Sequence, residues 1–226
     1  MPALRLSIII PCLDEEGALE RPLQIALAQG DEVIVTDGGS VDGSIELARR
    51  LGAGVVVGGA GRGEQLQRGA AAASGDILLF LHADTELPPN AAQDIRRAIV
   101  EGAVGGAFLL TFDSPHWLQR LGAWLINRRT RWTRIPLGDQ AQFATAAAYR
   151  EIGGYRDWPI LEDLDFARRL GKHGRIAILP GPVTTAARRY RQGGTVRTVL
   201  RNWLIWILFA CGVPPKRLEK LYRKIR

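Results

Sequence analysis

Three short strand-like runs in the first half of the chain, of which residues 77–81 are continuously apolar, each lead into an aspartate. Residues 4–10 are followed by Asp14, residues 32–36 by Asp37, and residues 77–81 by Asp84. Ligands bind at the carboxyl ends of the strands in open α/β sheets, so we expect these carboxylates to meet at one edge. Carboxylate oxygens suit a hard divalent cation that bridges phosphates. The pattern predicts metal or phosphate chemistry, the alternative being that the acids only shape solvent-exposed turns.

Helix-like segments separate these runs. We expect helices over residues 16–28, 41–51, 63–73 and 90–100, with a further short strand at 55–57. Ser40 is the expected N-cap of the second helix. Strands that alternate with helices of this length indicate βαβ units and a mainly parallel sheet with helices on both faces.

The second half is mixed. Strands are expected over 107–112, 142–145 and 175–179, and helices over 116–129, 161–170, 195–211 and 214–226. No repeat or low-complexity linker divides the chain. We therefore expect one compact unit over 1–192, made of halves 1–101 and 102–192, with a helical appendage over 193–226.

Charge is unevenly distributed along the 226 residues. The net charge is +7, but from Arg188 onward eleven Lys and Arg against one acid give +10, while the rest carries −3. The basic character therefore belongs to the tail. Cys12 and Cys211 lie far apart and predict free thiols in a reducing compartment. With no signal peptide expected, we predict a cytoplasmic protein.

The appendage combines aromatic, apolar and basic residues. Its longest apolar run, residues 203–213, is shorter than the ~20 residues that span a bilayer. Segment 195–226 suits peripheral contact with the inner face of a membrane, but packing on the body or on a homodimer partner explains the apolar part equally well. No nucleic-acid-binding module accompanies the charge, so we expect no nucleic acid partner.

The first turn excludes one enzyme class. Residues 11–17 read Pro-Cys-Leu-Asp-Glu-Glu-Gly, where a dinucleotide fold would carry Gly-x-Gly-x-x-Gly for close approach to a pyrophosphate. Three acids would repel that group, and they suit hydrogen bonds to a base or a ribose instead.

Several motifs in order resemble glycosyltransferase family 2. They are Ser-Ile-Ile-Ile-Pro at 7–11 with the acids at 14–16, Thr-Asp-Gly-Gly-Ser at 36–40, Gly-Arg-Gly at 61–63 with Gln65, His-Ala-Asp at 82–84, Leu-Glu-Asp at 161–163, and Arg-Arg-Tyr at 188–190. The resemblance implies a GT-A fold and a nucleotide-diphospho-sugar donor, with a UDP-sugar favoured. Within the family, the chain resembles small bacterial transferases associated with radical-SAM, selenium or arsenosugar functions.

The family's donor residues carry over onto matching positions. The resemblance implies a donor site made of Pro11, Asp14, Glu16, Asp37, Gly38, Arg62, Gln65, His82, Ala83, Asp84, Arg188, Arg189 and Tyr190. Asp84 matches the last aspartate of the DxD motif that holds Mg²⁺ or Mn²⁺. The first position of that motif is His82, whose imidazole suits Mn²⁺ better than Mg²⁺.

The acceptor side is implied in the same way. Asp163 matches the general base of an inverting transfer, with Glu162 beside it, and Gly138, Asp139 and Gln140 fall where acceptor contacts are placed. For the two acids, the alternative is a structural role in the first turn of a helix, where negative charge favours the dipole. Asp139 is equally suited to capping the turn.

Two other functions remain open at this stage. A sugar-1-phosphate nucleotidyltransferase shares a related sheet, but its glycine-rich phosphate loop would follow the first strand and not the third. A non-catalytic membrane scaffold would use only the C-terminal helices. Three tryptophans at 117, 124 and 132 are expected to pack in a buried helix and not to stack on a sugar.

Overall fold

The computed structural model describes residues 4–187, 204–205, 207–209 and 211–223. The first half alternates strands and helices as predicted. Its elements are β1 (Leu6–Cys12), α1 (Glu16–Gln29), β2 (Glu32–Asp37), α2 (Ser44–Arg50), β3 (Gly54–Val57), α3 (Arg62–Ala72), β4 (Ile77–Phe80), β5 (Thr85–Glu86) and α4 (Ala91–Val100).

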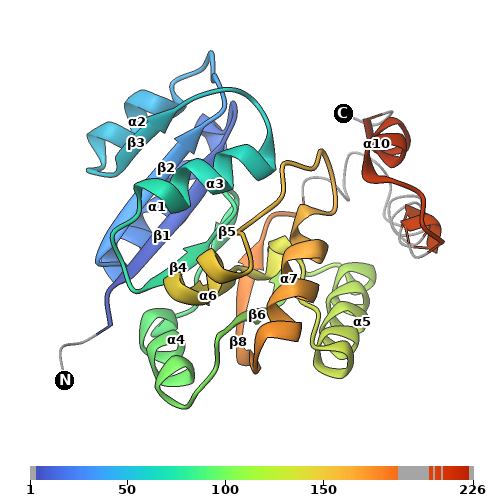
Figure 1. Ribbon diagram of the computed structural model, residues 1–226. Helices are drawn as coiled ribbons and strands as arrows, with labels where there is room; N and C mark the ends of the chain where they lie inside the picture. Colours follow the sequence, from blue (N-terminus) through green and yellow to red (C-terminus); the bar gives the residue numbers. More distant parts are fainter. Residues whose placement is uncertain (1–3, 188–203, 206, 210, 224–226) are drawn as a thin grey trace.

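The second half completes the same sheet. Its elements are β6 (Gly105–Phe112), α5 (Trp117–Thr133), the 3₁₀ turn η1 (Gly138–Gln140), β7 (Gln142–Thr145), α6 (Ala146–Glu151), α7 (Glu162–His173), β8 (Ile176–Thr185) and α10 (Pro215–Arg223). Within the described residues the strands follow the order β3-β2-β1-β4-β7-β6-β8-β5 (Figure 1). β1 to β4 run parallel, whereas β7 is antiparallel to both β4 and β6.

Helices cover both faces of this sheet because its central strands are apolar on both sides. Successive side chains of a strand point to opposite faces. Ile8 and Ile10 enter one core, under α1, α2 and α4, whereas Ile9 enters the other, under α3, α6 and α7. β4 alternates in the same way. This explains why the run at 77–81 is continuously apolar.

The carboxyl ends of the parallel strands lie at one edge. Cys12 pairs with Asp37, so β1 and β2 end side by side. β4 ends at Phe80, which pairs with Ile9, and His82 follows two residues later. The predicted convergence of the loops after β1, β2 and β4 at this edge is confirmed.

Three local predictions differ from the structure. α2 begins at Ser44 and not after Ser40, because the Ser40 hydroxyl bonds to the Asp37 carboxylate. β8 continues past the predicted end at 179, and a bulge in its pairing with β6 accommodates Pro180 and Gly181. β5 was not predicted, since its two residues form a strand only by pairing with the end of β8.

The described part of the C-terminal segment packs on the body. Ile205 and Leu218 form a small core with Ile160, and Phe209 makes an edge contact with Trp158 at 6.0 Å between ring centroids. The predicted helices over 195–211 and 214–226 fall partly outside the described residues. Among the helices that are described, none is both long and apolar enough to cross a membrane.

Candidate active site

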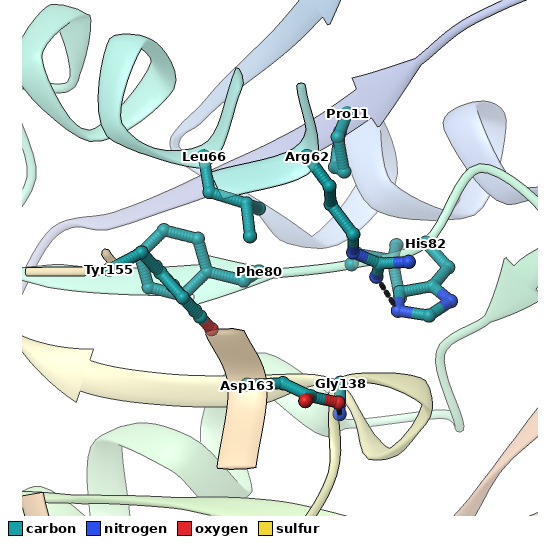
Figure 2. Close-up of a pocket in the computed structure, with 9 residues that line it drawn as sticks. Pro11, Arg62, Leu66, Phe80, His82, Gly138, Tyr155 and Asp163 are labelled. Atoms are coloured by element: carbon teal, nitrogen blue, oxygen red, sulfur yellow. Dashed lines mark hydrogen bonds between the residues drawn. The ribbon is translucent and has the colours of Figure 1, made fainter. Parts of the chain in front are cut away.

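A pocket opens at the carboxyl edge of the sheet, between the two halves of the chain. Pro11, Arg62 and His82 line it from the first half, and Gly138 and Asp163 from the second (Figure 2). Leu66, Phe80, Leu81 and Tyr155 complete the lining. The polar part of the pocket therefore contains residues from the motifs that suggested donor, metal and base roles.

Arg62 crosses this pocket from the first turn of α3. Its Nε lies 3.1 Å from Glu162 Oε1, and its Nη2 contacts His82 Nε2. The Glu162 side chain is 7% exposed and that of Arg62 is 30% exposed. A guanidinium so placed offers further N–H donors to an anionic ligand, because its planar fork binds phosphate oxygens in pairs.

Asp163 is held at the start of α7 by two backbone amides. Gly138 N donates to Asp163 Oδ2 at 2.7 Å, and Leu164 N donates to Oδ1 at 2.7 Å. A Cβ at Gly138 would lie 3.1 Å from both Asp163 Oδ2 and His82 Nε2, so a glycine fits best between these groups. The carboxylate of Asp163 is thus fixed at the pocket wall with little rotational freedom.

Gln142 and Tyr155 support this wall, and the sequence did not single them out. The Tyr155 hydroxyl donates to Gln142 Oε1 at 2.7 Å, and Gln142 Nε2 donates to the Asp163 carbonyl at 3.0 Å. Burial, foremost, raises the pKa of Tyr155 well above its ordinary value, with smaller contributions from nearby charges. A polar residue in the predicted strand at 142–145 was the only signal for Gln142.

The three acids of the first two loops accept hydrogen bonds from backbone amides. Asp14 Oδ1 accepts from Val41 N at 2.8 Å, and Glu16 Oε2 accepts from Gly43 N at 3.0 Å. Asp37 is fully buried, and its Oδ2 accepts from the amides of Gly39 and Ser40. The contacts of Asp14 and Glu16 join the two loops, whereas those of Asp37 order its own loop. All three acids therefore have structural partners at the predicted base and ribose site.

Gln65, in α3, links the ends of β1 and β2 through its side-chain amide. Its Nε2 donates to the carbonyls of Cys12 at 2.7 Å and Thr36 at 2.8 Å. A Cβ at Gly38 would come within 3.0 Å of this amide, so the loop passes close over it. Both residues lie at the predicted edge, with Gln65 buried beneath the loop and not in the pocket.

The His82–Asp84 loop is anchored to the end of β8. Ala83 is buried, the Asp84 carbonyl accepts from Ala186 N at 3.2 Å, and Thr85 Oγ1 lies 3.0 Å from Thr185 Oγ1. Across the described part of the chain, no group of three or more His, Cys, Asp or Glu side chains is arranged to hold a metal. Mg²⁺ is commonly held by one or two carboxylates plus substrate phosphates, so a single carboxylate at Asp84 fits a cation whose remaining ligands come from the donor and water.

The acceptor motif contains the pocket residue Gly138, the half-buried Asp139 and the buried Gln140. Gly138 lines the pocket, whereas Gln140 is fully buried and accepts from Thr130 Oγ1 at 2.9 Å. Arg129, which the sequence did not single out, lies beside this turn. Burial lowers the pKa of its guanidinium, and the charges of Asp139 and Asp163 oppose that shift.

The remaining donor residues of the prediction lie outside the described residues. These are Arg188, Arg189 and Tyr190. Of the last two described residues before them, Ala186 bonds to the Asp84 carbonyl of the His82–Asp84 loop, and Ala187 N donates to Asp113 Oδ1 at 2.7 Å.

Comparison with known proteins identifies relatives for most of the chain. The family model for glycosyl transferase family 2 matches residues 7–152. An undecaprenyl-phosphate 4-deoxy-4-formamido-L-arabinose transferase of Aeromonas hydrophila is 32% identical over 137 residues. The match covers 54% of this chain and 42% of that protein. An uncharacterised glycosyltransferase of Mycobacterium tuberculosis is 29% identical over 62% of the chain, which spans 66% of that relative.

Solved structures agree on the architecture. Glucosyl-3-phosphoglycerate synthase from Mycobacterium tuberculosis superposes with a TM-score of 0.64 at 23% identity, over 93% of this chain and 81% of that one. The first 349 residues of Staphylococcus aureus TarS superpose with a TM-score of 0.60 at 18% identity, over 82% of this chain and 61% of that one. Identity this low supports the fold alone, and that fold is GT-A. Since the family model covers well over half of the sequence, this chain belongs to glycosyltransferase family 2.

Proposed function

We propose that this protein transfers a glycosyl group from a nucleotide-diphospho-sugar, with a UDP-sugar favoured, to a hydroxyl of an acceptor. The observation that carries the proposal is the pocket in which the Asp163 carboxylate and the Arg62 guanidinium lie across from each other at the carboxyl edge of the sheet (Figure 2). The Asp163 carboxylate suits removal of a proton, and the Arg62 guanidinium suits binding of a diphosphate. The 102–192 half would then carry the acceptor side, and 1–101 the donor side.

In this mechanism Asp163 is the general base. Its carboxylate takes the proton of the acceptor hydroxyl as the hydroxyl oxygen attacks the anomeric carbon. The bond from that carbon to the diphosphate breaks, the nucleoside diphosphate leaves with the electron pair, and the anomeric configuration inverts. The amides of Gly138 and Leu164 hold the carboxylate oriented for this step.

Arg62 and the His82–Asp84 loop would bind the donor's diphosphate. Arg62 would keep its contact with Glu162 while its other nitrogens turn to phosphate oxygens. A bound Mg²⁺ or Mn²⁺ would neutralise the charge that develops on the leaving group, with Asp84 as its protein ligand and His82 beside it. One solved complex of the mycobacterial synthase contains Mn²⁺, UDP and glucosyl-3-phosphoglycerate, which supports the choice of donor class and cation for this chain.

Other predicted details stay proposals. We assign Asp14, Glu16, Asp37 and Gly38 to the base and ribose end, and Arg188, Arg189 and Tyr190 to a clamp on the diphosphate. The radical-SAM, selenium or arsenosugar branch, a homodimer, and membrane contact through 195–226 stay predictions; the packing of Ile205 and Leu218 on the body favours an intramolecular role for part of that segment.

A thermal-shift screen of UDP, GDP, UDP-glucose, UDP-GlcNAc and GDP-mannose, each with and without Mn²⁺, tests the proposal. A ligand at about 100 times its Kd adds about 2.7 kcal/mol, which raises the midpoint of a chain of this size by about 5–10 °C. We expect a nucleotide-specific, Mn²⁺-dependent shift that Asp84→Ala removes.

Asp163→Asn is the matched variant in this screen. It should keep the nucleotide shift while turnover falls by about 10²–10⁴-fold, because only the proton transfer is lost. Turnover close to that of the unmodified protein would rule out Asp163 as the base. Consumption of a nucleoside triphosphate with release of pyrophosphate would instead identify a nucleotidyltransferase.

A further inference from the structure

Among the described residues, α5 carries more exposed large hydrophobic side chains than any other element. Its side chains at five positions are large, hydrophobic and solvent-accessible: Trp117 (65% exposed), Leu121, Trp124 (55%), Leu125 and Trp132 (87%). We call this surface, together with Arg120, Arg128 and Arg131, the α5 face. The expectation that the three tryptophans pack in a buried helix is therefore wrong.

Helical spacing gathers these residues on one side. Positions 117, 121, 124, 125 and 132 fall within one arc at 100° per residue, and Gln119, Ala123 and Thr130 on the opposite arc are buried. Asn127 fixes the rotation of the helix, because its amide exchanges two hydrogen bonds with the backbone of Leu110 in β6. The exposed tryptophans consequently lie on the side of α5 away from the sheet. Figure 1 shows α5 at the periphery of the molecule.

The charge on this surface has a single sign. Residues 114–138 contain five arginines and no Asp or Glu. Arg120, Arg128 and Arg131 are exposed; Arg128 lies within the arc of the tryptophans, and Arg120 and Arg131 border it. The Arg128 guanidinium lies 5.5 Å from the centre of the Trp124 ring. Arginines between exposed tryptophans and leucines are typical of helices that lie in the interface of an anionic bilayer, where long basic side chains reach the headgroups.

We propose that the α5 face docks this protein onto the surface of an anionic lipid membrane. Charge decides against a second copy of the chain as the occupant. A two-fold interface places the same patch on both subunits, which would bring these arginines against each other with no carboxylate between them. Anionic headgroups neutralise the arginines, and the acyl boundary receives the indole rings and leucines.

The α5 face is linked to the candidate active site by the end of the same helix. Thr130 lies on the buried side of its last turns and bonds to Gln140 at 2.9 Å, and the turn that contains Gln140 presents Gly138 to Asp163. Docking would thus place the acceptor side of the pocket near the lipid surface. The docking proposal itself stands on the α5 face alone and does not depend on the glycosyltransferase activity.

Co-sedimentation of the full chain with vesicles tests the proposal. Phosphatidylcholine vesicles are compared with vesicles in which about a third of the lipid is phosphatidylglycerol. Each Arg near an anionic surface contributes about 1 kcal/mol of attraction, so Arg128→Gln with Arg131→Gln should weaken binding to the anionic vesicles by about tenfold or more. Trp124→Ser with Trp132→Ser should weaken it at least as much, because the apolar insertion is lost.

Matched controls lie elsewhere on the surface. Val100→Ser removes a hydrophobic side chain that is 78% exposed on α4, and Arg49→Gln with Arg50→Gln removes the same charge from α2. Both controls should bind as the unmodified protein does, and thermal midpoints should match throughout because all these side chains are exposed. The tryptophan and arginine pairs are independent variants, so misfolding of one leaves the other informative.

Three results would overturn the proposal. One is failure of the unmodified protein to bind anionic vesicles. Another is binding by both α5 variants that is as strong as that of the unmodified protein. That result would assign any membrane contact to a different surface such as 195–226. The third is an unmodified protein that is dimeric without lipid and becomes monomeric in the Trp124→Ser, Trp132→Ser variant, which would identify the α5 face as a self-interface.

Discussion

Most polar side chains around the pocket are held by the protein itself. Asp163 accepts from two amides, and Arg62 contacts Glu162 and His82. Groups positioned in this way need little reorganisation when charge develops in a transition state, which is a main source of enzymatic rate enhancement. In the proposed mechanism, a donor diphosphate that binds Arg62 would compete with the Arg62–His82 contact.

Tyr155 provides a residue-scale prediction with a defined pH dependence. Its hydroxyl donates to the buried Gln142, and burial raises its pKa above the ordinary value of 10.0. At neutral pH, Tyr155→Phe should lower the free energy of unfolding by about 1–3 kcal/mol, because Gln142 Oε1 loses its donor. Urea unfolding of the two proteins measures this difference.

Proton linkage sets the direction in which the free energy of unfolding changes with pH. Above about pH 10 the unfolded tyrosine loses its proton while the folded one keeps it, so stability falls as pH rises. The advantage of the unmodified protein over Tyr155→Phe is therefore complete below pH 10 and shrinks above it. Tyr149→Phe is the control, since that hydroxyl only accepts a 3.4 Å bond from Tyr155 N and should cost less. If the Tyr155→Phe variant were as stable as the unmodified protein at pH 7, the assignment would be contradicted.

At the scale of elements, α3 depends on a close approach to the sheet. A Cβ at Gly69 would collide with Ile9 Cγ2 in β1 and lie 2.9 Å from Thr36 Cγ2 in β2. This contact holds the helix that carries both Arg62 and Gln65 against the ends of the strands. The close contact at Gly69 therefore determines the backbone positions from which the Arg62 and Gln65 side chains extend.

Gly69→Ala should therefore lower stability by about 1–3 kcal/mol through overpacking, although alanine alone favours a helix by about 1 kcal/mol. Gly17→Ala is the matched control, because nothing lies within 4 Å of its Cβ position in α1. That variant should be neutral or stabilising by up to about 1 kcal/mol. Thermal unfolding of both proteins checks the opposite signs, and equal effects would contradict the packing argument.

At the scale of the whole molecule, one sheet joins the two predicted halves. β4 from the first half pairs with β7 from the second, and a single core contains Leu79 as well as Phe108. Neither half can bury its part of this core without the other. We therefore expect the halves to unfold together.

The positions of the tryptophans make this testable. Four of the six tryptophans lie in the 102–192 half, two lie in the 193–226 appendage and none lies in the first half. Their fluorescence therefore reports on unfolding outside the first half, whereas far-UV circular dichroism reports on the whole chain. Leu79→Ala, in the first half, should cost about 2–5 kcal/mol and shift both transitions equally. Val57→Ala, at a side chain that is 54% exposed, is the control and should shift neither. A fluorescence midpoint unmoved by Leu79→Ala would show independent halves.

Much of the first half was predictable because its signals are local. Apolar runs such as 77–81 and the helical segments between them follow from side-chain pattern, and parallel strands necessarily end at the same edge of the sheet. Ordered motifs then identified the family and named Arg62, His82, Gly138 and Asp163, which line the pocket. These inferences needed only the types and order of residues.

Tertiary structure decided what depends on distant partners. β5 exists only through pairing with Thr184 and Thr185, and the Ser40 hydroxyl bonds to Asp37 and does not cap the helix. Tyr155 bonds to Gln142 from beyond the intervening helix α6. Exposure of Trp117, Trp124 and Trp132 was likewise hidden, because spacing shows that residues share a helix face but not which face meets the sheet. The sequence by itself determined the fold class, the family and the principal pocket residues; long-range packing alone determined the rotation of α5 and the hydrogen bonds that hold the pocket.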